Sequence, residues 1–239
     1  MKTVILCGGR GTRLREYTAA TPKVLVEVGG KPILWHIMKS YAAHGFSDFV
    51  LALGYLGHQV EQRMHDESEQ GWSVTYADTG LDTNTGERLA RIRAHVEGAE
   101  PFFATYGDGV SDIDLASLRD FHCGHERAAT ITVVRPELQF GLVEVGDENV
   151  VSSFQEKPQL EGWINGGFFV FDQRVFDYLS VGSVLERGPL EGMARDSQLV
   201  AYRHEGFWAC MDTYKDNERL NAAWAEGDAP WRLWGEDGD

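Results

Sequence analysis

The sequence predicts an α/β protein with a doubly wound, mostly parallel sheet. In the first half of the chain, short apolar runs alternate with amphipathic segments, as strands alternate with helices in such folds. From about residue 128 the apolar runs lie closer together and turn residues such as those at 146–149 separate them, which indicates a more β-rich and antiparallel region. Any active face should lie at the carboxyl ends of the parallel strands.

Each predicted strand is a short apolar run, and each predicted helix repeats its apolar residues every three or four positions. In chain order, the first half contains strand 4–6, helix 33–43, strand 49–53, a polar helix around 59–67, strand 74–76, helix 88–96, strand 102–106 and helix 115–122. The second half contains strands 130–134, 142–145, 150–154 and 168–171, helices 175–179 and 189–195, strand 199–202 and a polar helix over 214–226. No repeat or linker divides this series, so a Rossmann-like mixed sheet is expected.

Composition limits the classes of protein to which the chain can belong. Its 239 residues, 43% of them hydrophobic, can bury the core of one domain. The net charge of −15 argues against a nucleic-acid surface, since phosphates would be repelled over most of the molecule. The cysteines at 7, 123 and 210 are odd in number and far apart. Cysteines in this arrangement suit a reducing compartment better than a disulfide framework. The sequence also has no leader-like segment and no apolar run of membrane-spanning length, so we expect a cytoplasmic protein.

A glycine-rich loop after the first strand is the most informative motif. Residues 6–14 read Leu-Cys-Gly-Gly-Arg-Gly-Thr-Arg-Leu, and Pro22-Lys23 follows. Bare glycine N–H groups can approach an anion while Arg13 and Lys23 supply positive charge, so the loop predicts a site for a nucleoside triphosphate. A dinucleotide fingerprint needs glycine where Leu14 stands, and a P-loop ends in Gly-Lys-Ser or Gly-Lys-Thr, so both are rejected. A plain strand-to-helix turn is the alternative.

Two aspartates are candidate metal ligands. Asp108 lies between two glycines after strand 102–106, and Asp212 follows another apolar stretch. Carboxylates from distant strands that converge on substrate phosphates suit Mg²⁺, which takes one or two protein oxygens and keeps several waters. Each aspartate also has a structural explanation, Asp108 as a turn residue and Asp212 as the N-cap of the helix that begins at Tyr214.

Two further motifs are candidates for binding a second ligand. Glu156-Lys157-Pro158 puts an ammonium at the end of strand 150–154, although a lysine in such a place is more often a solvated surface residue. Asn165-Gly166-Gly167 offers an amide side chain beside open backbone, which suits either recognition of hydroxyl groups or a tight turn.

Together these motifs resemble those of the sugar-1-phosphate nucleotidyltransferases, most closely the glucose-1-phosphate cytidylyltransferase branch. The resemblance runs through the segments LCGGRGTRL, PKVLVEVGGKPILWHIM, DTGLDTNTGERL, FATYGDGVSDIDL, SFQEKP, INGGFFVF, GFWACMDTYKDNERL and APWRLW. It implies that a sugar 1-phosphate, with glucose 1-phosphate as the first choice, attacks the α-phosphorus of CTP and releases pyrophosphate with the help of Mg²⁺. It also implies one domain over residues 1–239, with a nucleotide-binding half at 1–127 and a sugar-phosphate-binding half at 128–234. The charged residues at 235–239 are expected to form a disordered tail.

The resemblance implies a role for each matching residue. The nucleotide would contact Leu6, Cys7, Gly8, Gly9, Arg10, Gly11, Thr12, Arg13, Lys23, Thr83 and Arg88. The sugar 1-phosphate would contact Glu156, Lys157, Asn165, Gly166 and Gly167. Arg13, Lys23 and Asp108 would be catalytic, and Asp108 with Asp212 would hold Mg²⁺. The attacking phosphate oxygen is already ionised at neutral pH, so no general base is required.

Departures from the family pattern leave the finer assignments open. Cys7 replaces a usual alanine, Arg10 a usual apolar residue and Thr21 an often basic one, and the short stretch 65–71 stands where the branch usually has an insertion. UTP, dTTP or GTP, and another hexose, heptose or cyclitol phosphate, are therefore alternatives. A nucleotide-sugar sensing module without turnover is the alternative class, and the presence of Lys23 and both aspartates argues against it.

The oligomeric state is also left open by the sequence. Three tryptophans near the end of the chain, Trp224, Trp231 and Trp234, predict either a homo-oligomer contact or a C-terminal segment docked on the core.

Overall fold

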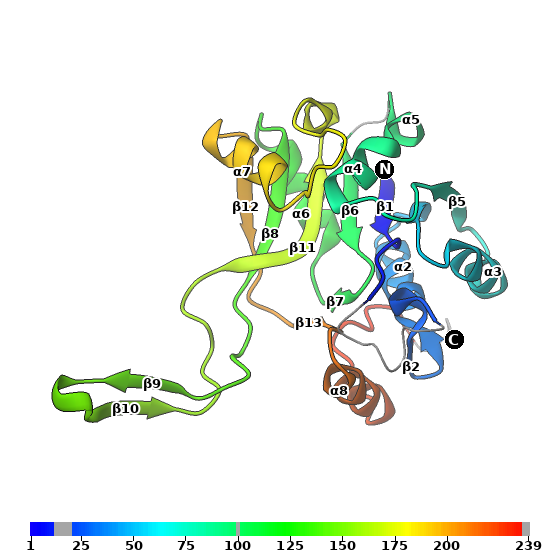
Figure 1. Cartoon of the computed structure of the whole chain (residues 1–239). Helices are drawn as coiled ribbons and strands as arrows, with labels where there is room; N and C mark the ends of the chain where they lie inside the picture. Colours follow the sequence, from blue (N-terminus) through cyan, green and yellow to red (C-terminus); the bar gives the residue numbers. More distant parts are fainter. Residues whose placement is uncertain (12–20, 99–100, 236–239) are drawn as a thin grey trace.

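A seven-stranded sheet forms the centre of the computed structural model, which describes residues 1–11, 21–98 and 101–235 (Figure 1). The strand order is β12 (Leu199–Arg203), β8 (Ala129–Val134), β11 (Ile164–Phe171), β6 (Phe102–Tyr106), β1 (Lys2–Leu6), β4 (Asp48–Leu53) and β5 (Ser73–Asp78). Within this sheet β11 is antiparallel to β6 and β8, whereas the other neighbouring strands pair in parallel. The predicted mixed, mostly parallel sheet is confirmed.

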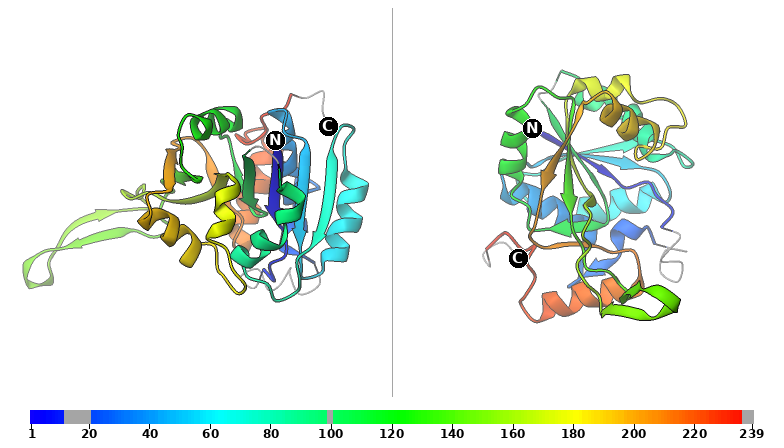
Figure 2. Two further views of the ribbon diagram at one scale, coloured as in Figure 1. Left: turned by 90° about the horizontal axis from the view of Figure 1, so that it is seen from above. Right: turned by 90° about the vertical axis from the view of Figure 1, so that its left-hand side faces the viewer.

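Helices cover both faces of the sheet because successive strand residues point to opposite sides (Figure 2). In β1, Val4 belongs to one apolar core and Ile5 to the other, and both are fully buried. The core with Ile5 includes α2 (Ile33–Ala43), α3 (Gly57–Glu67), α6 (Leu115–Cys123) and α8 (Tyr214–Ala225). The core with Val4 includes α4 (Thr85–Arg91), α5 (Arg93–Val96), the 3₁₀ helix η4 (Gln173–Asp177) and α7 (Gly188–Arg195). Over the described parts of the chain, every helix is too short or too polar to cross a bilayer.

The differences from the predicted elements are confined to short segments. The helix predicted over 88–96 is two helices, α4 and α5, which meet at Ile92, and the helix predicted over 175–179 is the tighter η4. Two short β-ladders, with two or three residues in each strand, were not predicted. They are β2 (Glu27–Val28) with β3 (Lys31–Pro32), near the 3₁₀ helix η2 (Lys23–Leu25), and β7 (Gly109–Ser111) with β13 (Trp208–Cys210). Such short runs show no periodicity.

An antiparallel hairpin projects from the body of the molecule (Figure 1). Its strands, β9 (Leu142–Val145) and β10 (Val151–Gln155), are joined through the 3₁₀ helix η3 (Asp147–Asn149). Across the ladder Val143 pairs with Phe154 and Val145 with Val151, and all four side chains are exposed. The hairpin is the clearest part of the antiparallel character predicted for the second half.

The C-terminal segment is docked against α2. Trp231 and Trp234 are buried, and the Trp231 indole N–H lies 3.4 Å from Nδ1 of the buried His36. Trp224 packs edge-on against the same imidazole at 4.8 Å between ring centroids. Of the two alternatives predicted for these tryptophans, the structure shows the docked segment.

Candidate active site

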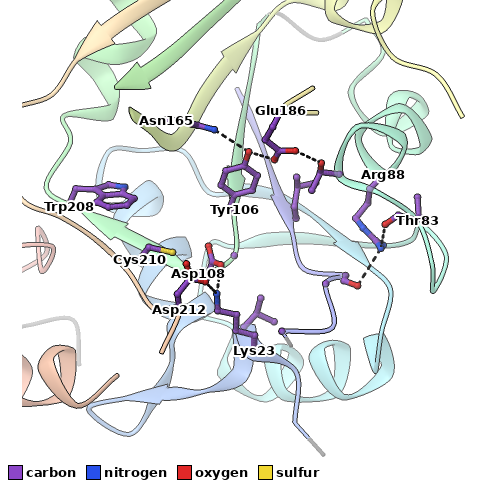
Figure 3. A pocket seen from close by; sticks show the side chains of 17 residues that line it. Lys23, Thr83, Arg88, Tyr106, Asp108, Asn165, Glu186, Trp208, Cys210 and Asp212 are labelled. Atoms are coloured by element: carbon purple, nitrogen blue, oxygen red, sulfur yellow. Dashed lines mark hydrogen bonds and ion pairs between the residues drawn. The ribbon is translucent and has the colours of Figure 1, made fainter. Parts of the chain in front are cut away.

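A cavity of about 560 Å³ opens where β1 and β6 end, at the carboxyl edge of the parallel strands (Figure 3). This is the edge at which open α/β sheets bind ligands. Residues from distant parts of the chain line it: Leu6, Gly8, Gly9, Gly11, Lys23, Val24, Thr83, Thr85, Arg88, Tyr106, Gly107, Asp108, Asn165, Glu186, Trp208, Cys210 and Asp212. The glycine loop, the two aspartates and Asn165 of the sequence prediction therefore share one cavity.

Lys23 lies between the two aspartates. Its Nζ donates to Oδ2 of Asp108 at 2.6 Å and to Oδ1 of Asp212 at 2.7 Å. The lysine side chain is only 12% exposed, against 25% for Asp108 and 33% for Asp212. Burial by itself would lower the pKa of Lys23, but the charge and hydrogen bonds of the two carboxylates outweigh it and the pKa is raised. The ammonium is therefore held in its charged form.

The small β7–β13 ladder brings the two aspartates together. Cys210 pairs with Gly109, and beyond that pair the Met211 N–H donates to the Asp108 carbonyl at 2.9 Å. Asp108 and Asp212 thus lie at the same end of the ladder, although 104 positions separate them in the chain. The N-cap of α8 is Thr213, which forms a capping box with Asp216, so the alternative of Asp212 as the helix cap is wrong.

The chemistry of the ligand atoms at this end of the ladder suits a hard divalent cation. Asp108, Cys210 and Asp212 each offer one ligand atom, and these atoms lie within 4.8 Å of one another. Burial, with the charges of both aspartates, raises the pKa of the Cys210 thiol, so it stays protonated and is a poor ligand. Two carboxylates with space for water match the preference of Mg²⁺ for oxygen.

Arg88 lines the cavity and also holds the glycine loop in place. It is 3% exposed, and its Nη atoms donate to the carbonyls of Leu53 at 2.6 Å, Thr83 at 2.9 Å, Gly80 at 3.1 Å and Gly8 at 3.3 Å. A Cβ at Gly8 would lie 2.1 Å from this guanidinium, so only glycine permits the approach. Burial lowers the pKa of Arg88, but arginine remains charged at neutral pH. The guanidinium holds in place the backbone that faces the cavity.

The family follows from a comparison of the chain with known proteins. A sequence profile described as nucleotidyl transferase matches residues 2–210. The chain belongs to the nucleotidyl transferase family. It is 43% identical to a glucose-1-phosphate cytidylyltransferase from Salmonella typhi, over 98% of this chain and 100% of that protein. It is 32% identical to the catalytic subunit beta of mannose-1-phosphate guanylyltransferase from Drosophila melanogaster, over 90% of this chain and 60% of that one.

A solved structure shows the same fold for this nucleotidyl transferase. HddC from Yersinia pseudotuberculosis superposes with a TM-score of 0.73 at 21% identity, over 93% of this chain and 99% of that one. The chain therefore shares the architecture of HddC, while the roles of its residues rest on the chemistry of the site.

Not every residue that the sequence assigns to the nucleotide lies in the cavity. Cys7 is 1% exposed and part of the core, and burial raises the pKa of its thiol. Arg10 points outward, where it forms an ion pair with Asp82 at 2.7 Å and covers the Tyr55 ring. Thr12 and Arg13, the latter predicted to be catalytic, lie outside the described residues.

The residues predicted for the sugar phosphate are divided. Asn165 lines the cavity, whereas Glu156 and Lys157 lie at the base of the projecting hairpin and face each other at 3.7 Å, with Lys157 51% exposed. They do not line the cavity because the chain leaves the sheet after β8 and returns to it only at β11.

The adjacent glycines support the cavity wall instead of lining it. The carbonyl of Gly166 accepts the Trp208 indole N–H at 2.7 Å. Gly167 has φ of +80°, and a Cβ there would lie 2.6 Å from the Tyr106 ring. Glycine is needed at this position for both reasons.

Sequence reasoning missed Glu186 and gave no role to Tyr106 and Thr85. The Tyr106 hydroxyl donates to Oε1 of Glu186, and Thr85 Oγ1 donates to Oε2 at 2.8 Å. The amide of Asn165 donates to the Tyr106 oxygen at 3.3 Å. Burial, and next the charge of Glu186, raise the pKa of Tyr106, so the phenol remains a donor. No motif surrounds Glu186, whose loop is defined only by its tertiary contacts.

Proposed function

We propose that this nucleotidyl transferase joins CTP and glucose 1-phosphate to give CDP-glucose and pyrophosphate. The observation that carries the proposal is the convergence of Lys23, Asp108 and Asp212 in a cavity that begins at a glycine loop. The choice of CTP and glucose 1-phosphate is supported by the names of the relatives that match over their whole length at 43% identity.

The reaction requires two anions to meet. An oxygen of the sugar phosphate attacks the α-phosphorus of CTP, a new P–O bond forms, and the bond to the β-phosphate oxygen breaks as pyrophosphate leaves. At an effective dielectric constant near 20, two unit charges about 4 Å apart repel each other by about 4 kcal/mol. The catalyst must therefore concentrate positive charge at one place on a protein whose net charge is −15.

Lys23 supplies that charge from the protein itself. Its ammonium is kept protonated by the two carboxylates and lies at the end of the cavity that they define. Asp108 and Asp212 would hold Mg²⁺, which neutralises phosphate charge and polarises the α-phosphoryl group when bound. The glycine loop, fixed by Arg88, presents backbone N–H groups to the phosphates. Because the nucleophile is already ionised, positioning and charge neutralisation suffice.

Lys157 remains the proposed ligand of the sugar phosphate on the basis of the family pattern. Since its side chain lies outside the cavity lining, this role requires the segment around Lys157 to approach the cavity when substrate binds. Asn165 already lines the cavity and is the proposed contact to a sugar hydroxyl.

A pyrophosphate-release assay tests the function. CTP, UTP, dTTP and GTP are each combined with glucose 1-phosphate and with other sugar 1-phosphates in the presence of Mg²⁺, and CTP with glucose 1-phosphate should give the largest kcat/KM. Release with another pair would reassign the base or the sugar. If no pair of substrates releases pyrophosphate, the proposed enzymatic activity is rejected and a sensing module is favoured.

Substitution of the aspartates tests the chemistry. Asp108→Asn and Asp212→Asn should each lower kcat by roughly 100-fold or more, because each removes a charged ligand of the cation. Asp66→Asn, a change at an exposed carboxylate of α3, is the matched control and should leave kcat unchanged. A near-normal rate in either test variant would place the cation elsewhere.

A further inference from the structure

Four polar side chains form one continuous chain of hydrogen bonds along the wall of the cavity. It runs from Asn165 on β11 through the Tyr106 hydroxyl at the end of β6 to the carboxylate of Glu186, as Figure 3 shows, and Thr85 at the start of α4 completes it. All four residues line the cavity. Asn165 is the proposed contact to a sugar hydroxyl, whereas the proposed function gives Glu186 no role.

The direction of the hydrogen bonds is set at the Asn165 end of this chain. The Gly167 N–H donates to Oδ1 of Asn165 at 2.8 Å, and the amide nitrogen could not accept that bond. The nitrogen therefore lies on the other side, where it donates to the Tyr106 oxygen at 3.3 Å. Because this oxygen accepts from Asn165, the Tyr106 proton has to point elsewhere, and it points to Oε1 of Glu186.

Glu186 is suited to receive the Tyr106 proton. An ionised carboxylate accepts hydrogen bonds and donates none, so the phenol can only be the donor of this pair. The other carboxylate oxygen accepts from Thr85 Oγ1 at 2.8 Å, and the same Oγ1 accepts the N–H of Leu185 at 2.9 Å. The carboxylate is thus attached to α4 on one side and fixes the direction of the Tyr106 O–H on the other.

The chain leaves a defined pair of groups on Asn165 for a ligand. Among the described residues, one amide hydrogen is used by Tyr106 and one lone pair of Oδ1 by Gly167. A carboxamide has two hydrogens and two lone pairs on its oxygen, so one donor and one acceptor remain on a side chain that lines the cavity. A sugar hydroxyl, which both donates and accepts, is complementary to that pair.

We infer that Glu186 is a positioning residue for the sugar 1-phosphate: by accepting the Tyr106 proton, it keeps the Asn165 amide in the orientation that meets a sugar hydroxyl. The inference rests on the proposed function, which assigns Asn165 to the sugar. Without the carboxylate, the Tyr106 O–H can rotate toward the Asn165 N–H, where two donors oppose each other, and the amide loses its fixed orientation. The loss of a preoriented group weakens binding of the sugar and not of the nucleotide.

Steady-state kinetics of the full-length enzyme tests the inference. Glu186→Ala should raise the KM for glucose 1-phosphate by roughly 3- to 10-fold, the effect of about one hydrogen bond, while the KM for CTP stays at the wild-type value. Glu186→Gln keeps an acceptor oxygen for Tyr106 and should keep both KM values near those of the wild type. Glu191→Ala, the same truncation at an exposed glutamate of α7, is the control and should change neither KM.

A double variant tests whether Glu186 acts through Tyr106. Tyr106→Phe removes the hydroxyl in the middle of the chain and should raise the KM for glucose 1-phosphate by a similar factor. Glu186→Ala combined with Tyr106→Phe should raise it no further than either change alone, because both break the same chain. Increases that multiply, or an equal rise in the KM for CTP, would overturn the inference. So would an increase for Glu186→Gln as large as that for Glu186→Ala, because the charge would then matter and not the acceptor oxygen.

A measurement without turnover separates this inference from the proposed function. The side-chain amide of Asn165 gives a pair of resonances in ¹H–¹⁵N NMR spectra, identified by their absence in Asn165→Ala. They should shift in Glu186→Ala and in Tyr106→Phe and keep their positions in Glu186→Gln, and unchanged positions in a folded Glu186→Ala would overturn the inference. If the wild type releases no pyrophosphate, or if Asn165→Ala leaves the KM for glucose 1-phosphate unchanged, the proposed function fails, while the amide resonances still decide whether Glu186 orients Asn165.

Discussion

The substitution Arg88→Lys tests whether Arg88 supports the glycine loop or contacts the nucleotide directly. The guanidinium donates to four backbone carbonyls and to Thr79 Oγ1 while almost fully buried. A lysine ammonium keeps the charge but has a single nitrogen, so it cannot reach acceptors spread around the planar fork. We expect at least two buried carbonyls to lose their partners.

The expected loss of unfolding free energy follows from the number of hydrogen bonds that are lost. A hydrogen bond from a charged donor contributes about 1.5–3 kcal/mol, so the loss of two lowers the free energy of unfolding by about 3 kcal/mol, at the low end because the backbone can relax. For a chain of this size, that corresponds to a fall in Tm of roughly 6–12 °C.

Thermal unfolding followed by circular dichroism measures the Tm, and steady-state kinetics well below the transition measures the KM for CTP. Arg91→Lys is the control. Arg91 lies one turn away, its side chain is half exposed, and a lysine at this position can still pair with Glu87, so the Tm should change far less. If Arg88→Lys leaves the Tm unchanged and raises only the KM for CTP, Arg88 binds the nucleotide directly and the supporting role is refuted.

Two further predictions concern a buried histidine and the hairpin base. Burial, reinforced by the charge of His125, lowers the pKa of His122 from 6.5 to about 4. The unfolded chain therefore binds a proton at His122 at a higher pH than the folded chain does. As the pH falls from about 6.5 to 4, the wild type should lose about 3 kcal/mol of unfolding free energy more than His122→Gln in urea titrations. Equal losses would show that His122 is not the group responsible. Lys157→Ala should raise the KM for glucose 1-phosphate more than the KM for CTP in the pyrophosphate assay, and equal increases would exclude a specific contact with the sugar phosphate.

The sheet could be predicted from the sequence because its strands are apolar runs long enough to show a pattern. The run 102–106 coincides with β6, and the helical period of 33–43 coincides with α2. The glycine loop, Asp108 and Asp212 were found at strand ends for the same reason, since the carboxyl edge of a parallel sheet gathers such residues.

Other parts of the site depend on contacts that leave no local pattern. The β7–β13 ladder pairs three residues with three others about a hundred positions away, too few for a period to show. Arginine is equally suited to bind a phosphate or a set of carbonyls, so its residue type could not reveal that Arg88 faces the backbone. Glu186 lies in a loop whose place is fixed by Asn84–Glu87, and only the folded chain brings them together.

The pairing of β7 with β13 has a consequence for the order in which the protein is assembled. On the ribosome, strands β1, β4, β5 and β6 can associate once the first hundred or so residues have emerged, but Asp108 has no acidic neighbour across the ladder until Asp212 has been synthesised. Closing so long a loop is slow compared with local folding. A nascent chain can therefore possess its glycine loop well before it has the pair of carboxylates to which the proposed function assigns a divalent ion, so the proposed metal site is completed late in biosynthesis.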